Sequence, residues 1–166
     1  MSVAATAPVK ASAATANIGM AQAAARCDGG SLTAVLGSCI GLALYHPRLR
    51  AGAMAHIVLP DSRGNTGPAA KFADTAVDHL IKLLKEQGVP ASGLIAKVAG
   101  GASMFGKTGP LQVGAANAQA VAQELRRLNI QIAGEHVGGN KGRRATLDTR
   151  TGQYMIEIVG EPPRVL

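Results

Sequence analysis

Apolar residues recur along this chain in short runs from residue 31 onward, and the length and alternation of these runs predict β-strands. The first run covers residues 32–36 and ends at Gly37 and Ser38. Residues 39–45 and 51–59 form two further runs, which predict a hairpin around a turn at residues 46–49. Later runs predict strands at residues 94–98, 130–137, 144–148 and 153–159.

Two segments instead carry apolar residues at spacings of three and four, which is the pattern of a helix with one buried face. The first predicts a helix over residues 69–87, with Gly88 as its C-terminal cap, and the second predicts a helix over residues 115–128. Strand runs interrupted by two helices predict the α/β fold class, as a layered domain with a mixed β-sheet and two main helices.

The first 25 residues show no apolar periodicity and consist mainly of small residues. They predict a flexible N-terminal tail at residues 1–25, followed by a single domain at residues 26–166. No apolar run approaches the length of a membrane-spanning helix, and the tail lacks the Leu/Val-rich stretch of a secretory signal. We therefore expect a cytoplasmic protein.

Composition narrows the function classes. The chain holds two Tyr, two Phe and no Trp, which excludes an aromatic stacking surface for single-stranded nucleic acid. Its 17 basic and 10 acidic residues give a net charge of +7, which suits an acidic partner, although a solvated basic surface is the simpler interpretation. Two cysteines are too few for a disulfide framework.

Residues 101–108 match the phosphate-loop pattern G-x-x-x-x-G-K-[ST] after a predicted strand. A phosphate loop needs its Lys-Thr pair to open a helix, whereas Gly109 and Pro110 follow here at once. The runs at residues 130–133 and 156–159 continue into Gly-Glu and do not end in an acidic residue suited to hold magnesium. Nucleotide binding is therefore the weaker hypothesis, and a Gly-rich loop that allows a close backbone approach is favoured.

Cys39 is the stronger candidate, because it follows Gly37 and Ser38 at the edge of a strand. With a turn at residues 46–49, the hairpin pairs Cys39 directly with His56 on one face of the sheet. A nearby imidazolium lowers the pKa of a thiol and favours the thiolate. Thr33 on the adjoining strand is the candidate to orient His56.

The other candidates are weaker. His136, beside two glycines at a strand end, is the alternative base. Cys27 has no histidine placed near it and is interpreted as inert.

Five blocks resemble the CheD family of chemoreceptor glutamine deamidases, in the order and spacing of that family from about residue 31 to 152. The blocks are Leu36-Gly-Ser-Cys39-Ile, Gly52-Ala-Met-Ala-His56-Ile-Val-Leu-Pro60, Lys71-Phe-Ala-Asp74-Thr-Ala, Lys97-Val-Ala-Gly-Gly-Ala-Ser-Met-Phe105, and Gly138-Gly-Asn140 with Gly142-Arg143. In this interpretation the phosphate-loop match is a coincidence. The sequence departs from the family where Ala116 precedes Asn117, since similar sequences usually carry Arg before this Asn.

The resemblance implies a catalytic triad of Cys39, His56 and Thr33, which deamidates selected glutamines of methyl-accepting chemotaxis receptors through a cysteine thioester. It implies no metal or organic cofactor, and a fold resembling the catalytic domain of the cytotoxic necrotizing factor toxins. Related proteins are also associated with the CheC phosphatase. Backbone groups at Ser38, Gly100, Gly101 and Ser103 are the expected oxyanion donors or substrate contacts.

Two other classes remain open. One is a non-catalytic adaptor that binds CheC and does not need Cys39. The other is a nucleotide-binding protein that uses the phosphate-loop pattern.

Overall fold

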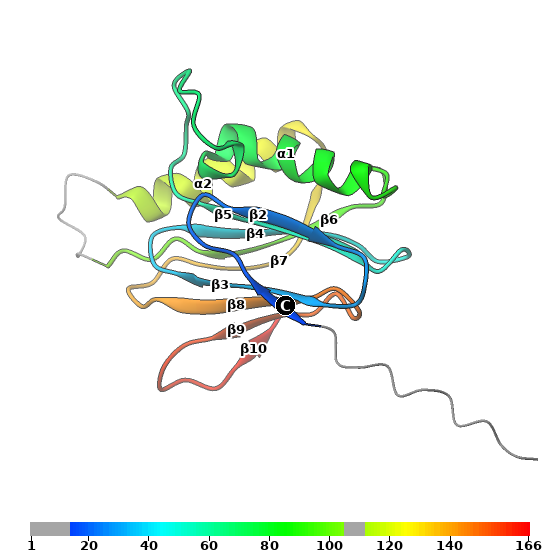
Figure 1. Ribbon diagram of the computed structural model, residues 1–166. Helices are drawn as coiled ribbons and strands as arrows, with labels where there is room; N and C mark the ends of the chain where they lie inside the picture. Colours follow the sequence, from blue (N-terminus) through cyan, green and yellow to red (C-terminus); the bar gives the residue numbers. More distant parts are fainter. Residues whose placement is uncertain (1–13, 105–111) are drawn as a thin grey trace, which may run out of the picture.

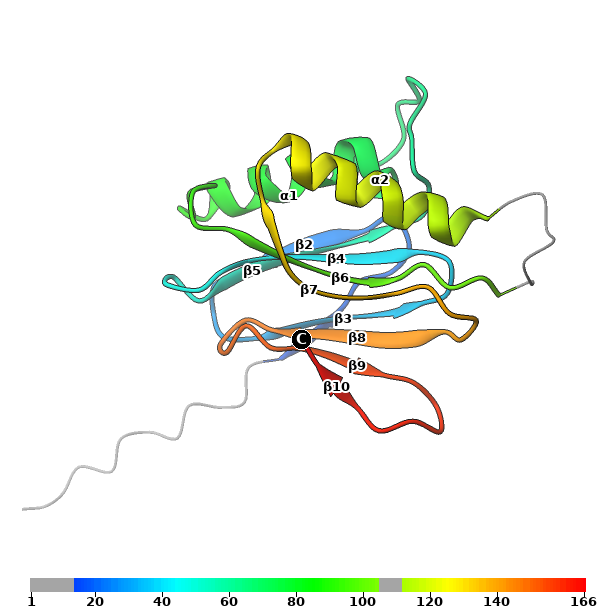
Figure 2. The ribbon, with the colours of Figure 1, turned by 180° about the vertical axis from the view of Figure 1, so that it is seen from behind.

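The computed structural model describes residues 14–104 and 112–166, which form two five-stranded β-sheets packed face to face with two helices on the outside (Figures 1 and 2). The α/β class is confirmed, but the strands lie in two sheets where the sequence predicted one. Each sheet is mixed, since β1 runs parallel to β3 and β6 runs parallel to β7.

The first sheet has the strand order β1-β3-β8-β9-β10. Its strands are β1 (Thr15–Asn17), β3 (Ser31–Leu36), β8 (Arg143–Asp148), β9 (Tyr154–Glu157) and β10 (Arg164–Val165). The second sheet has the order β2-β5-β4-β6-β7. Its strands are β2 (Ala23–Arg26), β5 (Ala51–Ile57), β4 (Ile40–His46), β6 (Ile95–Gly100) and β7 (Gln131–Val137).

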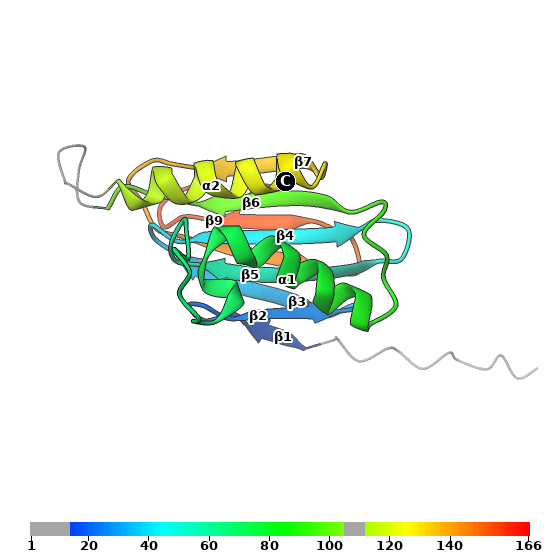
Figure 3. The ribbon, with the colours of Figure 1, turned by 90° about the horizontal axis from the view of Figure 1, so that it is seen from above.

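Helices α1 (Ala73–Glu86) and α2 (Val113–Arg127) cover the outer face of the second sheet, and the 3-10 turn η1 (Ala69–Lys71) precedes α1. Seen from above, α1 lies over the β5 side of that sheet and α2 over the β6 side (Figure 3). Both predicted helices are confirmed. The predicted start at residue 69 is early, because the first turn is η1 and α1 begins only after Phe72 takes an extended conformation.

Two apolar cores follow from this layering. One fills the space between the helices and the second sheet, and includes Leu42, Leu80 and Leu125. The other fills the space between the two sheets, and includes Leu32 on β3 and Met54 on β5. Cys39 belongs to this second core. Successive strand residues alternate between faces, so Leu42 and Leu44 of β4 face the helices whereas Ala43 faces the other sheet.

The segment predicted as a tail takes part in both sheets. β1 pairs with β3, and β2 pairs with β5 on the other sheet, so residues 15–26 cross from one sheet to the other. Backbone hydrogen bonds hold these edge strands and require no apolar periodicity, which explains why the sequence pattern missed them. Residues 1–13 lie outside the described part of the chain.

Candidate active site

The hairpin of β4 and β5 places Cys39 and His56 on the same face of the second sheet. Its observed register pairs Gly41 with His56 and His46 with Ala51. The direct pairing of Cys39 with His56 was therefore wrong by two residues, because the turn spans residues 47–50 and not 46–49. A shift of two residues preserves the face, so the thiol and the imidazole become diagonal neighbours of the kind that long side chains can bridge.

Both side chains are almost fully buried. Cys39 is 8% exposed and lies in the core between the sheets, and His56 is 4% exposed. His56 alternates with Ala55 and Ile57, which face the helices, and therefore shares the inner face with Met54. The structure thus brings the predicted nucleophile and the predicted base to one side of the sheet.

A backbone carbonyl fixes the orientation of the His56 ring. Nδ1 of His56 lies 2.9 Å from the carbonyl oxygen of Ile18, in the segment that crosses between β1 and β2. A carbonyl can only accept, so Nδ1 carries the proton and Nε2 is left as the basic atom. Ile18 could not be predicted from the sequence, because a main-chain acceptor leaves no trace in residue type.

Thr33 does not lie where the sequence analysis expected it. Its side chain is on the opposite face of β3 from Leu32 and Leu36, which fill the core between the sheets. The hydroxyl group lies 2.8 Å from the Thr146 hydroxyl, and it donates to the carbonyl of Ala145 at 3.2 Å. The expectation that this hydroxyl orients His56 was therefore wrong for this geometry.

The backbone of Thr33 is nevertheless connected to His56. The N–H of Ile18 donates to the Thr33 carbonyl at 2.7 Å, and the carbonyl of Ile18 receives the His56 ring. Thr33 thus supports the imidazole through β3 and Ile18, independently of its hydroxyl group.

The glycine-rich turn after β6 packs directly on Cys39. The N–H of Gly101 donates to the Cys39 carbonyl at 3.0 Å, and the N–H of Ala102 donates to Gly37 at 3.0 Å. Gly100 has a φ of +112°, and a Cβ built on it would lie 2.1 Å from the Cys39 carbonyl oxygen. Glycine is therefore required at this position for the two segments to approach.

A third loop completes the surroundings of Cys39. Ser103 donates its N–H to Gly139 at 2.8 Å, and Gly138 donates to Gly100 at 3.0 Å. The loops after β3, β6 and β7 lie at one end of the sandwich (Figure 2). The N–H groups of Gly101 and Ser103 are thus used within the protein, which disfavours them as oxyanion donors, while their role as substrate contacts stays a prediction. This leaves the Ser38–Cys39 segment as the candidate donor.

Burial raises the pKa of the Cys39 thiol above its ordinary value. This direction is opposite to the lowering that the sequence analysis expected from a neighbouring imidazolium, because the loss of hydration disfavours the charged thiolate. The resting thiol is consequently protonated at neutral pH. Attack on a substrate then requires a base that removes the proton during the reaction, which is a suitable task for Nε2 of His56.

A family profile and individual relatives agree on the family of this chain. The family profile described as "CheD chemotactic sensory transduction" matches residues 58–158. A protein of Symbiobacterium thermophilum named "Probable chemoreceptor glutamine deamidase CheD" is 46% identical over 131 residues, covering 75% of this chain and 79% of its own length. The "Chemoreceptor glutamine deamidase CheD" of Thermotoga maritima is 42% identical over 129 residues, covering 78% of this chain and 82% of its own.

A "Probable chemoreceptor glutamine deamidase CheD" of Clostridium botulinum is 47% identical over 135 residues, with 78% of this chain and 83% of the relative covered. The chain belongs to the CheD family. The profile match begins two residues after His56 and therefore covers neither Cys39 nor His56. The placement of these two residues on one face rests on the register of the β4–β5 hairpin in this CheD-family protein.

The alternative base, His136, has a different environment in this CheD-family protein. Arg143 is 3% exposed and donates from Nη1 to the His136 ring and to the His136 carbonyl, both at 2.8 Å. Burial and the charges of Arg143 and Arg164 lower the pKa of His136. Arg143 also donates to the carbonyls of Gly138 and Lys141, so this pair organises the loop after β7.

The remaining candidates from the sequence, Cys27 and the phosphate-loop pattern, are not part of the pair formed by Cys39 and His56. Cys27 is exposed, and its thiol donates to Gln87 at 2.9 Å. Helix α2 begins at Val113, and residues 105–108 of the phosphate-loop motif lie outside the described part of the chain. Within the described residues, no cluster of three or more His, Cys, Asp or Glu is arranged to hold a metal. No described helix is both long enough and apolar enough to cross a membrane.

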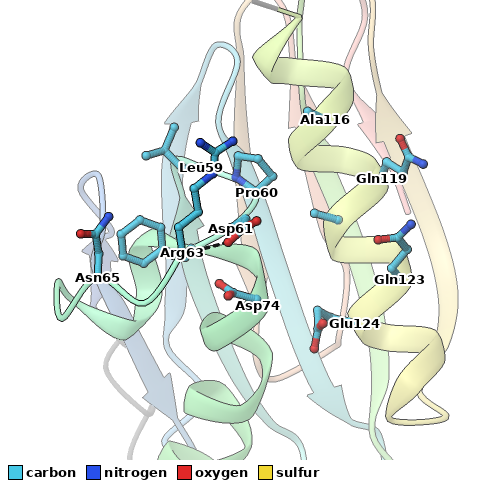
Figure 4. A pocket seen from close by; sticks show the side chains of 12 residues that line it. Leu59, Pro60, Asp61, Arg63, Asn65, Asp74, Ala116, Gln119, Gln123 and Glu124 are labelled. Atoms are coloured by element: carbon cyan, nitrogen blue, oxygen red, sulfur yellow. Dashed lines mark hydrogen bonds between the residues drawn. The ribbon is translucent and has the colours of Figure 1, made fainter.

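A polar cleft of about 770 Å³ lies between α2 and the segment that follows β5 (Figure 4). Asp61, Arg63 and Asp74 line one side, and Gln119, Gln123 and Glu124 of α2 line the other. Asp74 accepts from the N–H and the hydroxyl group of Ser62, which fixes the start of the loop. The cleft lies outside the Cys39–His56 site, and we assign it no catalytic part.

Proposed function

We propose that this CheD-family protein hydrolyses the side-chain amides of selected glutamines of chemotaxis receptors to glutamates. The observation that carries the proposal is the placement of a buried thiol and a buried imidazole on one face of the β4–β5 hairpin, with the imidazole fixed by Ile18. The names of the relatives state the same activity for those proteins. Cys39 is the nucleophile, His56 is the base, and Thr33 supports His56 through its backbone.

The first half of the reaction forms a thioester. Nε2 of His56 removes the proton from the Cys39 thiol as the sulfur attacks the carbon of the glutamine amide. The resulting tetrahedral oxyanion accepts from backbone N–H groups of the Ser38–Cys39 segment. When the intermediate collapses, the C–N bond breaks and the nitrogen takes the proton from His56, so ammonia leaves and the acyl group stays on sulfur.

The second half consumes one water molecule. Neutral His56 removes a proton from water, and the oxygen attacks the thioester carbon. The C–S bond breaks, the sulfur recovers the proton from His56, and the resulting carboxylic acid is released and loses its remaining proton through solvent to ammonia. The net reaction is amide plus water to carboxylate and ammonium, and it leaves Cys39 and His56 in their starting protonation states.

Three further features belong to this proposal. The protein acts in the cytoplasm, where the signalling parts of chemotaxis receptors lie, and it binds the CheC phosphatase. Its fold resembles the catalytic domain of the cytotoxic necrotizing factor toxins. The support for this last point is the thiol–imidazole pair in a two-sheet α/β domain.

Ammonia release from a purified receptor fragment tests the proposal against its two alternatives. We expect wild-type protein to release ammonia and Cys39→Ser to release none, because the much higher pKa of the alcohol prevents His56 from removing its proton as it does from the thiol. An adaptor would bind receptor or CheC without releasing ammonia. A nucleotide-binding protein would show saturable binding in an ATP titration. Our proposal predicts no such binding.

A further inference from the structure

One polar side chain of α2 is completely buried beside the catalytic hairpin. Asn117 is 0% exposed, and its amide Nδ2 donates to the carbonyl of Ser38 at 3.1 Å and to the carbonyl of Val58 at 3.0 Å. Ser38 directly precedes the nucleophile, and Val58 follows the base by two residues. A single carboxamide group therefore joins the two segments that carry the site.

The approach of α2 to this site depends on its first turn. Gly114 lies one turn before Asn117, and a Cβ added to it would lie 2.5 Å from the Gly101 carbonyl oxygen and 2.6 Å from that of Ala102. The helix therefore contacts the turn that packs on Cys39, backbone against backbone. This close approach brings the short Asn117 side chain within reach of both carbonyls.

Among the described residues, one oxygen atom of the buried Asn117 carboxamide lacks a hydrogen-bond partner, and this unfavourable burial indicates that the orientation of the amide group matters. Its Oδ1 atom is buried and, within the described structure, has no hydrogen-bond partner. A buried carbonyl oxygen without a partner is unfavourable, and such a group in a native structure calls for an explanation. The two Nδ2 hydrogen bonds supply one, because they fix the amide orientation and leave Oδ1 on the unpartnered side.

We propose that Asn117 is a positioning residue for the deamidation reaction. A peptide unit is planar and trans, so its C=O and N–H groups point in opposite directions. By holding the Ser38 carbonyl, Asn117 fixes the Ser38–Cys39 peptide and directs the Cys39 N–H away from α2. We assign that N–H as an oxyanion donor, because the N–H groups of Gly101 and Ser103 already donate to carbonyl groups of the protein.

The second hydrogen bond has a related consequence. Holding the Val58 carbonyl ties the end of β5 to the Cys39 segment, and this fixes the separation between the thiol and the imidazole. Asn117 thus acts on both steps that need alignment, proton removal by His56 and stabilisation of the oxyanion. This inference rests on the proposed function for its effect on turnover.

The test uses Asn117→Ser and Asn117→Asp in the full chain, with Gln123→Ser as the matched control on an exposed position of the same helix. Serine can keep one donor bond, whereas aspartate turns an oxygen toward the two carbonyls. We expect kcat on a receptor fragment to fall roughly 10- to 100-fold in Asn117→Ser with little change in KM, because misaligning an oxyanion donor acts on the transition state. Gln123→Ser should behave as wild type.

Alkylation of Cys39 by iodoacetamide gives a second readout that needs no receptor. If Asn117 aligns the thiol with His56, the pH dependence of alkylation will shift in both Asn117 variants while Cys27 reacts as before. This readout separates the two proposals, since it stands even if receptor deamidation by the wild type were absent. A folded Asn117→Ser protein with wild-type kcat and a wild-type alkylation profile would overturn the inference, whatever its thermal stability. If Asn117→Asp does not fold, the result for Asn117→Ser decides alone.

Discussion

The two side chains that we propose as catalytic, Cys39 and His56, differ in their surroundings and therefore in their proposed roles. Cys39 lies in an apolar core that disfavours its charged form, and His56 has one ring nitrogen fixed on a carbonyl and the other available as a base. The thiolate is thus formed only when His56 accepts the proton. A buried thiol of this kind is protected from adventitious oxidation in the resting enzyme, because oxidants react with the thiolate.

The raised pKa of Cys39 predicts the pH dependence of its alkylation. The group is neutral below its pKa, so the reactive thiolate fraction increases with pH through and beyond the ordinary thiol range of about 8.5. We expect the alkylation rate at Cys39, followed by peptide mass mapping, to rise continuously up to that range. A rate that is already constant below about pH 7 would instead indicate a stable thiolate and contradict this account.

The position of Thr33 predicts a mild effect of Thr33→Val. Valine keeps the β-branched shape and the backbone carbonyl that holds Ile18, and it removes only the bonds to Thr146 and Ala145. We expect turnover within a few-fold of wild type and a free energy of unfolding lower by about 1 kcal/mol, measured by urea denaturation. A loss of turnover of about 10-fold or more in a folded protein would return the hydroxyl to the His56 site.

The loops after β3, β6 and β7 act as one unit, since the loop after β6 donates backbone hydrogen bonds to the loop after β3 and exchanges them with the loop after β7. The segment around Gly100 is the most constrained part of this unit. Gly100→Ala would place a methyl group on the Cys39 carbonyl at a φ that alanine rarely adopts. We expect loss of activity by at least about 10-fold, because displacing the nucleophile by a fraction of an ångström misaligns the attack.

Gly88→Ala is the control for this substitution. Gly88 also has a positive φ, but its Cβ would meet nothing within 4 Å. It should cost about 1 kcal/mol in stability and leave turnover unchanged. Equal kinetic effects of the two substitutions would show that backbone strain, and not the contact with Cys39, is responsible.

The strand and helix positions were largely predictable, because buried faces impose periods of two and about 3.6 on the sequence. The face shared by Cys39 and His56 was also predictable, since it survives any register error of two residues. The exact register of the β4–β5 hairpin was not predictable, because the turn residues allow more than one loop position. Contacts made by main-chain groups, such as the one between Ile18 and His56, were out of reach for the same analysis.

The assignment of strands to two sheets also exceeded what the sequence offers. Strands β3 and β8 pair across more than a hundred residues of chain, and nothing in either run specifies its partner. Strands β1 and β2 are rich in small residues and sit at sheet edges, where backbone pairing alone suffices. Family resemblance supplied the candidate site, and the structure replaced the role of the Thr33 hydroxyl with a backbone carbonyl.

The whole molecule carries a net charge of +7. If its receptor substrate is acidic, the encounter is accelerated by electrostatic attraction, which salt screens. We expect kcat/KM on a receptor fragment to fall several-fold between low and physiological ionic strength, while alkylation of Cys39 by neutral iodoacetamide stays constant. A kcat/KM that does not depend on salt would limit the basic surface to a role in solubility.

Site-resolved mass spectrometry of a receptor fragment tests the central claim most directly. Incubation in ¹⁸O-labelled water should convert selected glutamines to glutamates that each carry one labelled oxygen, since the thioester is hydrolysed by solvent. Wild type and Cys27→Ser should give the same converted sites, and Cys39→Ser and His56→Ala should give none while remaining folded. Labelled glutamates formed at the wild-type rate by Cys39→Ser would contradict the account.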